Sequence, residues 1–561
     1  MGGCDHRCMI AGVSIPKRRH RPAWQTLGMD AVDALIEERW FLGAAERGNP
    51  ATSIRPWTLG NRVEALVHGR SYFPRLLGEL RDLRAGDLVV LADWRGDPDQ
   101  RLDGPGTELG EVLAGAARRG VQVKGLLWRS HPSRAHFNEE PNLHLGDKVN
   151  HAGGEVLLDE RVRGAGSQHQ KLVVLRHAGR LDHDVAFAGG IDLCHGRGDD
   201  EHHLGDPQTA LLDPRYGPRP PWHDAQVEIR GPAVGDLMAT FRERWEDPTP
   251  LDHRNPWRAR LTRRVAQPRH PGPLPEPLPD PGAAGQHAVQ ILRTYPAKRP
   301  RLPFAPQGER SVARAYIKAF QRARRLIYVE DQFLWSEEVA SILADALRRS
   351  PSLRLIAVVP RFPDQDGPLT GPPNRIGQQA ALDVVRAVGG DRAAVYDLQN
   401  EAGTPIYVHA KVCVIDDVWA AVGSDNLNRR SWTHDSELAA AVLDSTRDTR
   451  APEDPAGLGD GARVFARELR LRLWREHLGR APGDDADLLD LERGFHAWRE
   501  QAAALEAWHR RGRTGPRPSG RALEHRPGRV RPWAAWWAWP LYRTVVDPDG
   551  RPWRLRRAHA F

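Results

Sequence analysis

The chain has 561 residues, which is too long for one hydrophobic core, so two or more domains or lobes are expected. With 40% hydrophobic and 27% charged residues, its composition is that of a globular protein and excludes a wholly disordered one. The net charge of +8 comes from 81 basic and 73 acidic residues. Spread over this length, that charge fits an anionic substrate or a membrane surface without requiring either.

Cysteine usage and apolar runs bear on the compartment. The four cysteines, Cys4, Cys8, Cys194 and Cys413, form no disulfide framework and no paired zinc-ligand pattern, which favours a reducing compartment. The first residues lack the continuous apolar segment of a secretory signal, and no apolar run approaches the roughly 18 residues of a membrane span. We therefore expect a cytoplasmic protein without a transmembrane segment, free or peripheral to a membrane.

A regular pattern of elements begins after residues 1–57, in which only one helix is predicted, over 30–46. Helix-like segments and short apolar runs then alternate, which is typical of an α/β fold. In chain order they are SYFPRLLGELRDL, LVVLADW, ELGEVLAGAARRG, VQVKGLLW, GEVLLDE, HQKLVVL and WHDAQVEIRGPAV.

The same order recurs further along the chain. The second series reads SVARAYIKAFQRA, LIYVEDQ, EVASILADALRRS, LRLIAVVP, AAVYDL, HAKVCVID and THDSELAAAV. Even a dipeptide is repeated, because His223-Asp224 is matched by His434-Asp435. The duplication predicts two similar α/β lobes with mixed sheets flanked by helices, related by a pseudo-two-fold axis.

The breaks in this pattern predict five segments. They are an N-terminal extension (1–57), a first lobe (58–265), an extended proline-rich linker (266–284), a second lobe (285–480) and a C-terminal extension (481–561). The last segment holds a helix-like stretch from Asp484 and a tail rich in tryptophan and arginine. That tail suits either a lipid interface or a packed covering of the core, and the turn-like residues Pro540 and 547–550 favour the covering.

A His-x-Lys step opens one apolar run in each lobe. In a strand, residues two apart point to the same side, so His169 and Lys171 share a face, and so do His409 and Lys411. Packing of the lobes about a pseudo-two-fold axis would bring all four side chains into one pocket at the lobe interface.

Two imidazoles and two ammonium groups suit a phosphodiester substrate. One histidine can attack phosphorus and form a covalent intermediate. The other can protonate the departing alkoxide and then deprotonate the attacking water or alcohol. The lysines can hold the non-bridging oxygens, so the set requires no metal ion or other cofactor.

Neighbouring residues extend the predicted site. We expect carboxylates to fix the histidine tautomers, with Glu437 and Asp224 as candidates, and further residues to approach the substrate. These further residues are Gly189, Gly190 and Asp192 in the first lobe and Gly423 and Ser424 in the second, with Gln332 lining the pocket beside Glu330 and Asp331. Asp416 and the amide donor Asn426 are expected among the catalytic residues. The acidic and histidine-rich segment 198–208 has no defined ligand spacing, so we interpret it as a solvated loop rather than a metal cluster.

These motifs resemble those of a known family. HAKVCVIDDVWAAVGSDNLN matches the pattern H-x-K-x4-D-x6-G-S-x-N of the phospholipase D superfamily at every defined position, and HQKLVVL, GGIDLC, IYVEDQ and WHDAQVEIRGPA resemble its members with two motifs in one chain. The resemblance spans about residues 58–480. It implies a pseudo-symmetric α/β fold and phosphatidyl transfer to water or a small alcohol through a phosphohistidine. It also implies that His169 is the nucleophile and His409 the general acid and base.

The first motif departs from the family pattern. Arg176 stands in place of the motif aspartate, and Asp182 or Asp184 in a longer insertion could take over that aspartate's largely structural role. Asp192 stands where many relatives have asparagine. Aligning the two copies sets Gln226 opposite Glu437, which leaves open whether Asp224 or Gln226 orients His169.

The expected activity is hydrolysis or transphosphatidylation of glycerophospholipids at the distal phosphoester bond. The alternatives are a phosphatidyltransferase of the cardiolipin synthase kind, a nuclease of the same superfamily, and an inactive lipid- or phosphate-binding protein. We expect no nucleic-acid partner, because the basic residues are scattered among acidic ones instead of forming a groove. The oligomeric state is left open.

Overall fold

The computed structural model describes residues 31–129, 139–252, 266–364, 366–367 and 370–561. Cys4, Cys8 and the prediction that no secretory signal is present fall on residues 1–30, outside this description. Within the described residues, no helix has the length and apolar character needed to cross a bilayer.

The first half of the molecule alternates strands and helices as predicted. Its strands are β1 (Thr58–Val67), β2 (Leu88–Asp93), β3 (Gln122–Trp128), β4 (Glu155–Asp159), β5 (Leu172–Arg176), β6 (Val185–Gly189), β7 (Trp222–His223) and β8 (Ala225–Arg230). Its helices are α3 (Gly69–Asp82), α4 (Leu109–Arg118), α5 (Glu139–His151) and α6 (Ala233–Trp245).

The second half repeats this order. Its strands are β9 (His287–Tyr295), β10 (Glu309–Arg310), β11 (Leu326–Glu330), β12 (Arg354–Val358), β13 (Ala393–Leu398), β14 (Tyr407–Val408), β15 (Val412–Ile415), β16 (Trp419–Gly423) and β17 (Glu437–Asp444). Its helices are α8 (Ser311–Arg322), α9 (Glu337–Arg349), α10 (Gly371–Gly389), α11 (Arg429–Thr433) and α12 (Val464–Leu478).

Helix α9 shows how the sequence specifies these elements. The Ser336 hydroxyl accepts from the Val339 N–H at its start, acidic residues occupy its first turn, and Arg348 and Arg349 its last. Both ends therefore complement the helix dipole. The buried residues Val339, Ala340, Leu343, Ala344, Ala346 and Leu347 form one apolar face.

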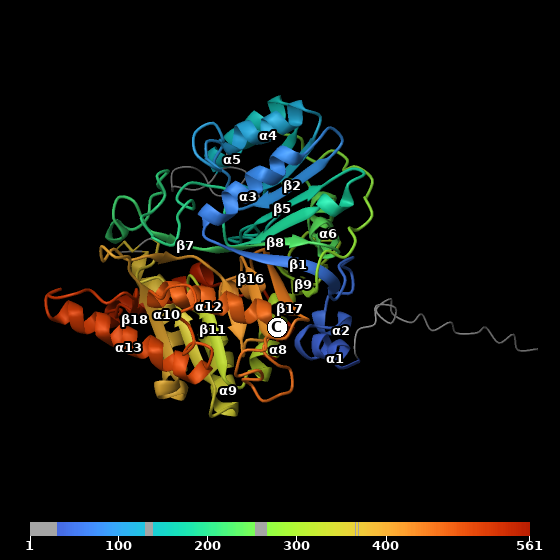
Figure 1. The fold of residues 1–561 in the computed structure, drawn as a ribbon. Coiled ribbons are helices and arrows are strands. Elements are labelled where there is room, and N and C mark those ends of the chain that lie inside the picture. The colour runs from blue at the N-terminus through green and yellow to red at the C-terminus, as the bar shows by residue number, and fades with distance from the viewer. Residues whose placement is uncertain (1–30, 130–138, 253–265, 365, 368–369) are drawn as a thin grey trace, which may run out of the picture.

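The two halves share one continuous sheet, which confirms the predicted mixed α/β fold. With β18 (Ala522–Glu524) at one edge, its strand order is β18-β13-β12-β11-β15-β16-β17-β9-β1-β8-β6-β5-β2-β3-β4, and β10 pairs with β9. Read outward from the central antiparallel β9–β1 pair, equivalent strands follow in the same order on both sides. This is the predicted pseudo-two-fold relation, and Figure 1 shows the halves meeting at β1 and β9.

Alternating side chains divide the core into layers. Leu326 and Tyr328 of β11 join one apolar cluster with α6, α12 and α13 (Leu491–Arg510), and this cluster extends across both halves. Ile327 and Val329 face the opposite side, into a cluster with α8, α9 and α10. A third cluster packs α3, α4 and α5 on the first half of the sheet, the layer at the top of Figure 1. The sheet is thus covered by helices on both faces.

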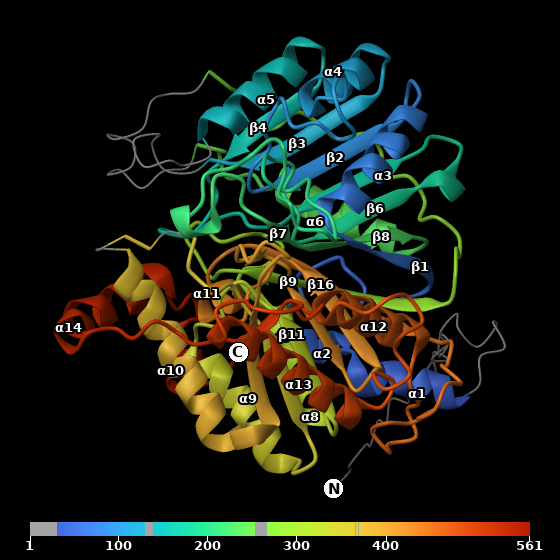
Figure 2. The same ribbon diagram turned by 60° about the vertical axis from the view of Figure 1, so that its left-hand side comes forward.

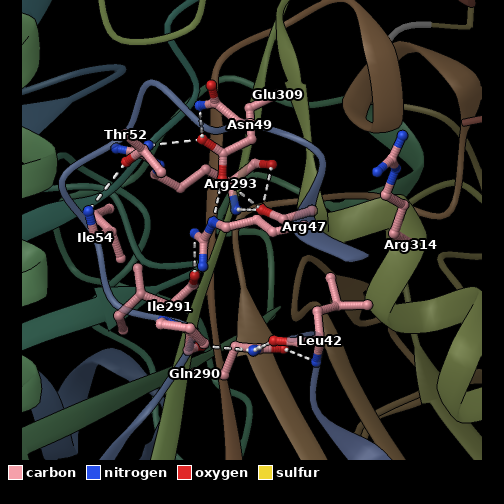
Figure 3. Close-up of polar contacts among 12 residues, drawn as sticks. Leu42, Arg47, Asn49, Thr52, Ile54, Gln290, Ile291, Arg293, Glu309 and Arg314 are labelled. Atoms are coloured by element: carbon pink, nitrogen blue, oxygen red, sulfur yellow. Dashed lines mark hydrogen bonds and ion pairs between the residues drawn. The ribbon is translucent and has the colours of Figure 1, made fainter. Parts of the chain in front are cut away.

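The N-terminal extension is part of this core. The predicted helix over 30–46 is two helices, α1 (Ala31–Trp40) and α2 (Ala44–Arg47). Figure 3 shows the segment after α1 bound to β9, where the Leu42 N–H and C=O both pair with the Gln290 side chain. Nearby, Glu309 accepts from Arg47 at 2.9 Å and from Arg293 at 2.7 Å.

The C-terminal extension lies along the second half. Strand β18 (Ala522–Glu524) pairs antiparallel with β13 at the end of the sheet. Helix α14 (Pro532–Leu541) and the π-helical turn Tyr542–Val546 then run beside α10, as Figure 2 shows. Ala534, Ala538 and Tyr542 are buried there, as expected of a packed covering. Trp533 and Trp536, however, are 67% and 85% exposed.

Segment 266–284 contains no helix or strand, as expected of a linker, and it contacts the first half through Gly272 and Trp245. Because the halves share one sheet, the predicted boundaries at 57, 265, 284 and 480 stay predictions as domain limits.

Candidate active site

Each His-x-Lys step is anchored to the other half of the molecule. Strand β14, just before His409, pairs in parallel with β7, and the His409 N–H donates to the His223 carbonyl at 2.8 Å. The equivalent contact is a bridge between Gln168 and Ser436, where the His169 N–H donates to the Ser436 carbonyl at 2.9 Å. Both histidines are therefore fixed by strand-like contacts across the pseudo-two-fold axis.

A carboxylate from the opposite half orients each imidazole. His169 Nδ1 lies 2.9 Å from Glu437 Oε2, and His409 Nδ1 lies 2.7 Å from Asp224 Oδ2. A carboxylate on Nδ1 places the ring proton there and leaves Nε2 free to act on a substrate. Gln226 binds neither ring, because its Oε1 accepts from the Ile191 N–H at 3.2 Å.

The alignment that set Gln226 opposite Glu437 was therefore wrong by two residues. In the sheet, Gly189 pairs with Gln226 and Gly423 with Ala439, so Asp224 is the structural equivalent of Glu437. The repeated His-Asp dipeptide was a coincidence of residue types, and the register of the strands decides the equivalence.

The two lysines lie beside the histidines. Lys171 Nζ forms an ion pair with Asp192 Oδ1 at 3.0 Å and donates to the His169 carbonyl at 2.9 Å. Lys411 Nζ donates to Gln332 Oε1 at 3.1 Å and to the His409 carbonyl. Three donors on each ammonium allow a further bond to a bound phosphate oxygen.

The pocket also holds groups that the motifs did not predict. Arg197 donates to Asp192 Oδ2 at 3.0 Å, and its guanidinium lies 4.0 Å over the Trp222 ring. That ring in turn lies 5.0 Å from His409, and Trp94 lies 6.3 Å from His169. Neither tryptophan belongs to a His-x-Lys step. The only sequence signal for them is that Trp94 ends one predicted apolar run and Trp222 opens another.

These groups line one cavity of about 340 Å³. Its walls include the two histidines, Asp192, Arg197, Gln332, Asn426 and Glu437, the aromatic residues Trp94, Trp128, Trp222, Phe333 and Tyr407, and the leucines Leu211 and Leu212. Leu211 is 93% exposed, so an apolar side chain stands where the cavity reaches solvent. Charged and polar side chains thus line one part of the cavity's surface, and aromatic side chains line much of the rest.

Burial and neighbouring charge set the protonation of the site. Burial, followed by Lys171 and Lys411, holds the pKa of His169 well below its usual range. Burial, with Lys411 next, does the same for His409. Burial and Asp435 raise the pKa of Glu437 to about 8, and burial lowers the pKa of Lys411 to about 8. Both histidines are therefore neutral in the substrate-free site.

Comparison with known proteins agrees with this geometry. The family model for phospholipase D matches residues 95–268, and the model for the phospholipase D-like domain of cardiolipin synthase matches residues 316–450. Each match holds one His-x-Lys step, and together they cover more than half of the chain. The chain belongs to the phospholipase D superfamily.

Curated members of the superfamily match over long stretches. Phospholipase D alpha 1 of Cynara cardunculus is 26% identical over 517 residues, covering 68% of this chain and 60% of that protein. Phospholipase D1 of Saccharomyces cerevisiae is 25% identical over 553 residues, covering 80% of this chain and 30% of that protein. The chain thus spans less than two thirds of the length of these relatives. The crystal structure of phosphatidylserine synthase from Haemophilus influenzae Rd KW20 is 14% identical, with a TM-score of 0.44, over 68% of this chain and 82% of that one.

Asp416, the aspartate of the superfamily motif, holds the backbone and lies away from the cavity. Asp416 lies at the opposite end of β15 from Lys411, and its carboxylate accepts from the backbone N–H groups of residues 324, 325 and 326 at 2.7–2.8 Å. It therefore fixes the start of β11 and does not reach the cavity, contrary to its expected place among the catalytic residues.

Arg176 occupies the equivalent position in the first half. Its Nε donates to Asp184 Oδ2 at 2.7 Å, and its Nη2 donates to the Pro279 carbonyl at 2.5 Å. Asp184, one of the two expected substitutes, also accepts from the His177 N–H at 2.6 Å. The missing motif aspartate is therefore replaced by an ion pair at the end of β5 away from His169.

The small residues expected to approach substrate instead pack against the neighbouring strand. A Cβ at Gly190 would lie 2.1 Å from Asp224 Oδ1, and one at Gly189 would lie 2.5 Å from the Gln226 side chain. A Cβ at Gly423 would lie 2.4 Å from Ala439 Cβ, and the Ser424 hydroxyl donates to Glu437 Oε2 at 2.6 Å. None of these four lines the cavity, and only Gly190 and Ser424 contact the orienting carboxylates, those of Asp224 and Glu437.

Of the three residues at the end of β11 that were expected to line the pocket, only one does so. Gln332 lines the cavity, and its Nε2 donates to the Tyr407 hydroxyl at 2.8 Å. Asp331 is buried and accepts from backbone N–H groups, including that of Leu427 at 2.7 Å. Glu330 is buried against His223 and faces away from the cavity. The prediction of pocket lining thus holds for Gln332 alone among the three.

Proposed function

We propose that this chain is a phospholipase D-type phosphodiesterase. It cleaves the distal phosphoester bond of glycerophospholipids and passes the phosphatidyl group to water or a small alcohol. The observation that carries the proposal is the pair of imidazoles in one cavity, each with a carboxylate on Nδ1 and a lysine beside it. Two such groups meet the need of a two-step displacement at phosphorus for one nucleophile and one proton carrier.

In the first step His169 Nε2 attacks phosphorus. The bond from phosphorus to the head-group oxygen breaks, and His409 gives its Nε2 proton to that departing oxygen. The anionic phosphodiester favours this protonated form of His409, because it adds negative charge beside a buried imidazole. Lys171, Lys411 and the Asn426 amide bind the non-bridging oxygens and stabilise the transition state.

In the second step the phosphatidyl group leaves His169. Neutral His409 takes a proton from water or an alcohol, whose oxygen attacks phosphorus and breaks the bond to His169. We assign the attack to His169 because its side chain is the more accessible of the two, at 15% against 6% for His409. The family resemblance supports the same assignment.

The substrate is proposed to reach the cavity from a membrane surface. Arg430 lines the cavity and donates to the Val545 carbonyl, which connects the cavity wall to the end of the tryptophan-rich tail. Trp533 and Trp536 of that tail and Leu211 at the cavity are exposed. Indole rings favour the membrane interface, so these exposed side chains suit peripheral binding to lipid.

The test is incubation of the pure protein with phosphatidylcholine vesicles and a primary alcohol. We expect free choline and the phosphatidyl-alcohol, and we expect His169→Ala and His409→Ala to lose at least about 10³-fold in rate. Failure to release choline, with nucleic acid cleaved instead, would overturn the lipid assignment.

The match to a cardiolipin synthase domain favours one second candidate, a phosphatidyltransferase whose acceptor is another lipid. Phosphatidylglycerol vesicles without added alcohol distinguish it. Diphosphatidylglycerol and free glycerol would support this candidate, whereas phosphatidic acid and glycerol support hydrolysis.

A further inference from the structure

A cluster of histidine and glutamate side chains, all buried except the partly exposed Glu476, lies next to the segment that contacts His409. Its members are His68 at the start of α3, His203 in the loop before β7, His223 in β7, Glu330 in β11, and Glu476 and His477 in α12. The prediction of a solvated loop over 198–208 was wrong for His203, whose side chain is fully buried. No step of the proposed reaction uses these groups.

Three imidazole nitrogens converge on the Glu476 carboxylate. His68 Nε2 lies 2.9 Å from Oε2, while His203 Nε2 and His223 Nδ1 lie 3.0 and 3.4 Å from Oε1. The ligand atoms of the four side chains lie within 4.8 Å of one another. They come from four separate parts of the chain, so the fold itself assembles the group.

The hydrogen bonds of His203 require a cation or an extra proton at this point. Its Nδ1 lies 3.1 Å from the Trp222 carbonyl, which can only accept, so Nδ1 carries a proton. If the buried ring is neutral, the lone pair of Nε2 then faces a carboxylate oxygen at 3.0 Å, which is repulsive. A metal ion between the two atoms removes this conflict.

The second ring nitrogen of His223 also has a hydrogen-bond acceptor. Its Nε2 lies 2.7 Å from Glu330 Oε2, and Glu330 Oε1 receives the Tyr328 hydroxyl at 2.5 Å and His477 Nε2 at 2.7 Å. A histidine that binds a metal usually donates its other ring N–H to a carboxylate or a carbonyl, which fixes the tautomer. His223 has such a carboxylate and His203 such a carbonyl.

We propose that His68, His203, His223 and Glu476 bind one divalent transition metal ion, with Zn²⁺ the best fit. Nitrogen and oxygen ligands about 2.0–2.1 Å from a tetrahedral zinc ion lie about 3.3–3.4 Å apart. The separation of His223 Nδ1 from Glu476 matches this value at 3.4 Å, and those of His68 and His203, at 2.9 and 3.0 Å, need only a small expansion. Three histidines and a carboxylate complete a four-coordinate shell, which is the arrangement of a structural site.

The bound metal would hold in place the residues that orient His409. The His223 carbonyl accepts the His409 N–H, and the next residue, Asp224, binds His409 Nδ1. The His68 N–H also donates to the Asp224 carbonyl at 2.8 Å. The metal thus holds the segment that orients His409 and takes no part in the bond changes at phosphorus.

The test is the metal content of the full-length protein. After purification without chelator, and again after chelation and reloading with Zn²⁺ alone, elemental analysis should give about one zinc ion per chain that survives gel filtration. Reloading should raise the thermal midpoint. Replacement by Co²⁺ should give the visible bands of four-coordinate cobalt, which surface histidines do not produce.

Two variants locate the ion. His203→Gln should lose the zinc, whereas His477→Gln should keep it, because His477 Nε2 binds Glu330 and its Nδ1 lies 4.0 Å from Glu476 Oε1, beyond hydrogen-bond distance. The proposal is overturned if wild-type protein stays substoichiometric after reloading without four-coordinate cobalt bands, or if His203→Gln binds zinc like wild type. Should His203→Gln fail to fold, the wild-type measurements alone decide.

Discussion

At the scale of residues, the proposed chemistry depends on contacts that cross between the halves. His169 is oriented by Glu437 and His409 by Asp224, so neither half of the chain holds a complete imidazole–carboxylate pair. The halves also differ in charge at one position. In the first half Asp192 forms ion pairs with Lys171 and Arg197, whereas the equivalent residue of the second half is the neutral Asn426. This asymmetry gives two similar histidines different surroundings.

The pH dependence of kcat/KM should reflect Glu437 and Lys411. Glu437 orients His169 only when ionised, and burial with Asp435 raises its pKa to about 8, so activity should rise as pH increases toward 8. Burial lowers the pKa of Lys411 to about 8, so activity should fall above that value as its charge is lost. We expect a narrow bell centred near pH 8.

Lys411→Arg isolates the alkaline limb. The guanidinium keeps its charge, so the fall above pH 8 should disappear even if the rate drops overall. A descending limb that persists unchanged in this variant would assign it to another group and contradict the role given to Lys411.

How far the sequence predicted the site also depends on individual residues. The histidines and lysines were predictable because alternate residues of a strand share a face. The partner of His169 was not, since the His-Asp dipeptide suggested a register that the strand pairing contradicts. Arg197 and His203 belong to no spaced motif, and only folding brings their loop against β7.

At the scale of elements, the short strands β7 and β14 and the central β9–β1 pair hold the two halves together. The sequence predicted the repeated order of strands and helices, because apolar runs and amphipathic helices are local patterns. It did not predict the union of the two sheets, which depends on edge strands far apart in the chain.

Arg176→Asp tests whether the missing motif aspartate matters for activity. The change would place a buried carboxylate beside Asp184 and remove the bond to the Pro279 carbonyl. We expect a loss of about 3–5 kcal/mol in unfolding free energy, measured by denaturant titration, since one partner of a buried ion pair is lost.

Activity per folded molecule of this variant should not rise. A gain in kcat would show instead that the restored motif contributes to catalysis. Arg176→Lys, which keeps the charge, serves as the matched control and should lose less stability.

At the scale of the whole molecule, the large exposed aromatic side chains among the described residues are those of the C-terminal extension, Trp533, Trp536 and Trp553. The two halves bury the reacting groups between them, while the C-terminal tail packs against α10 through Ala534, Ala538 and Tyr542 and exposes its tryptophans. The C-terminal tail was predicted to cover the core, and its buried residues do so. Its tryptophans are nevertheless exposed, because a helix can pack on one face and expose another.

The exposed tryptophans should matter only at a lipid surface. Replacing Trp533 and Trp536 together with alanine should lower activity on phosphatidylcholine vesicles by roughly tenfold, about 1.4 kcal/mol of binding, because interfacial indole contacts are lost. Hydrolysis of a soluble short-chain phospholipid by the same variant should match that by wild type. Equal losses on both substrates would argue against peripheral docking through this face.

The central claim is that one shared site works through a covalent intermediate on His169. An aryl phosphodiester such as bis(4-nitrophenyl) phosphate tests it directly, because its leaving group departs without protonation. In His409→Ala the first step should proceed and the second should stall. We expect a burst of nitrophenolate equal to the enzyme concentration, with the phosphoryl adduct located on His169 by mass spectrometry after an alkaline quench. An adduct on His409 in His169→Ala, with no burst in His409→Ala, would contradict the account.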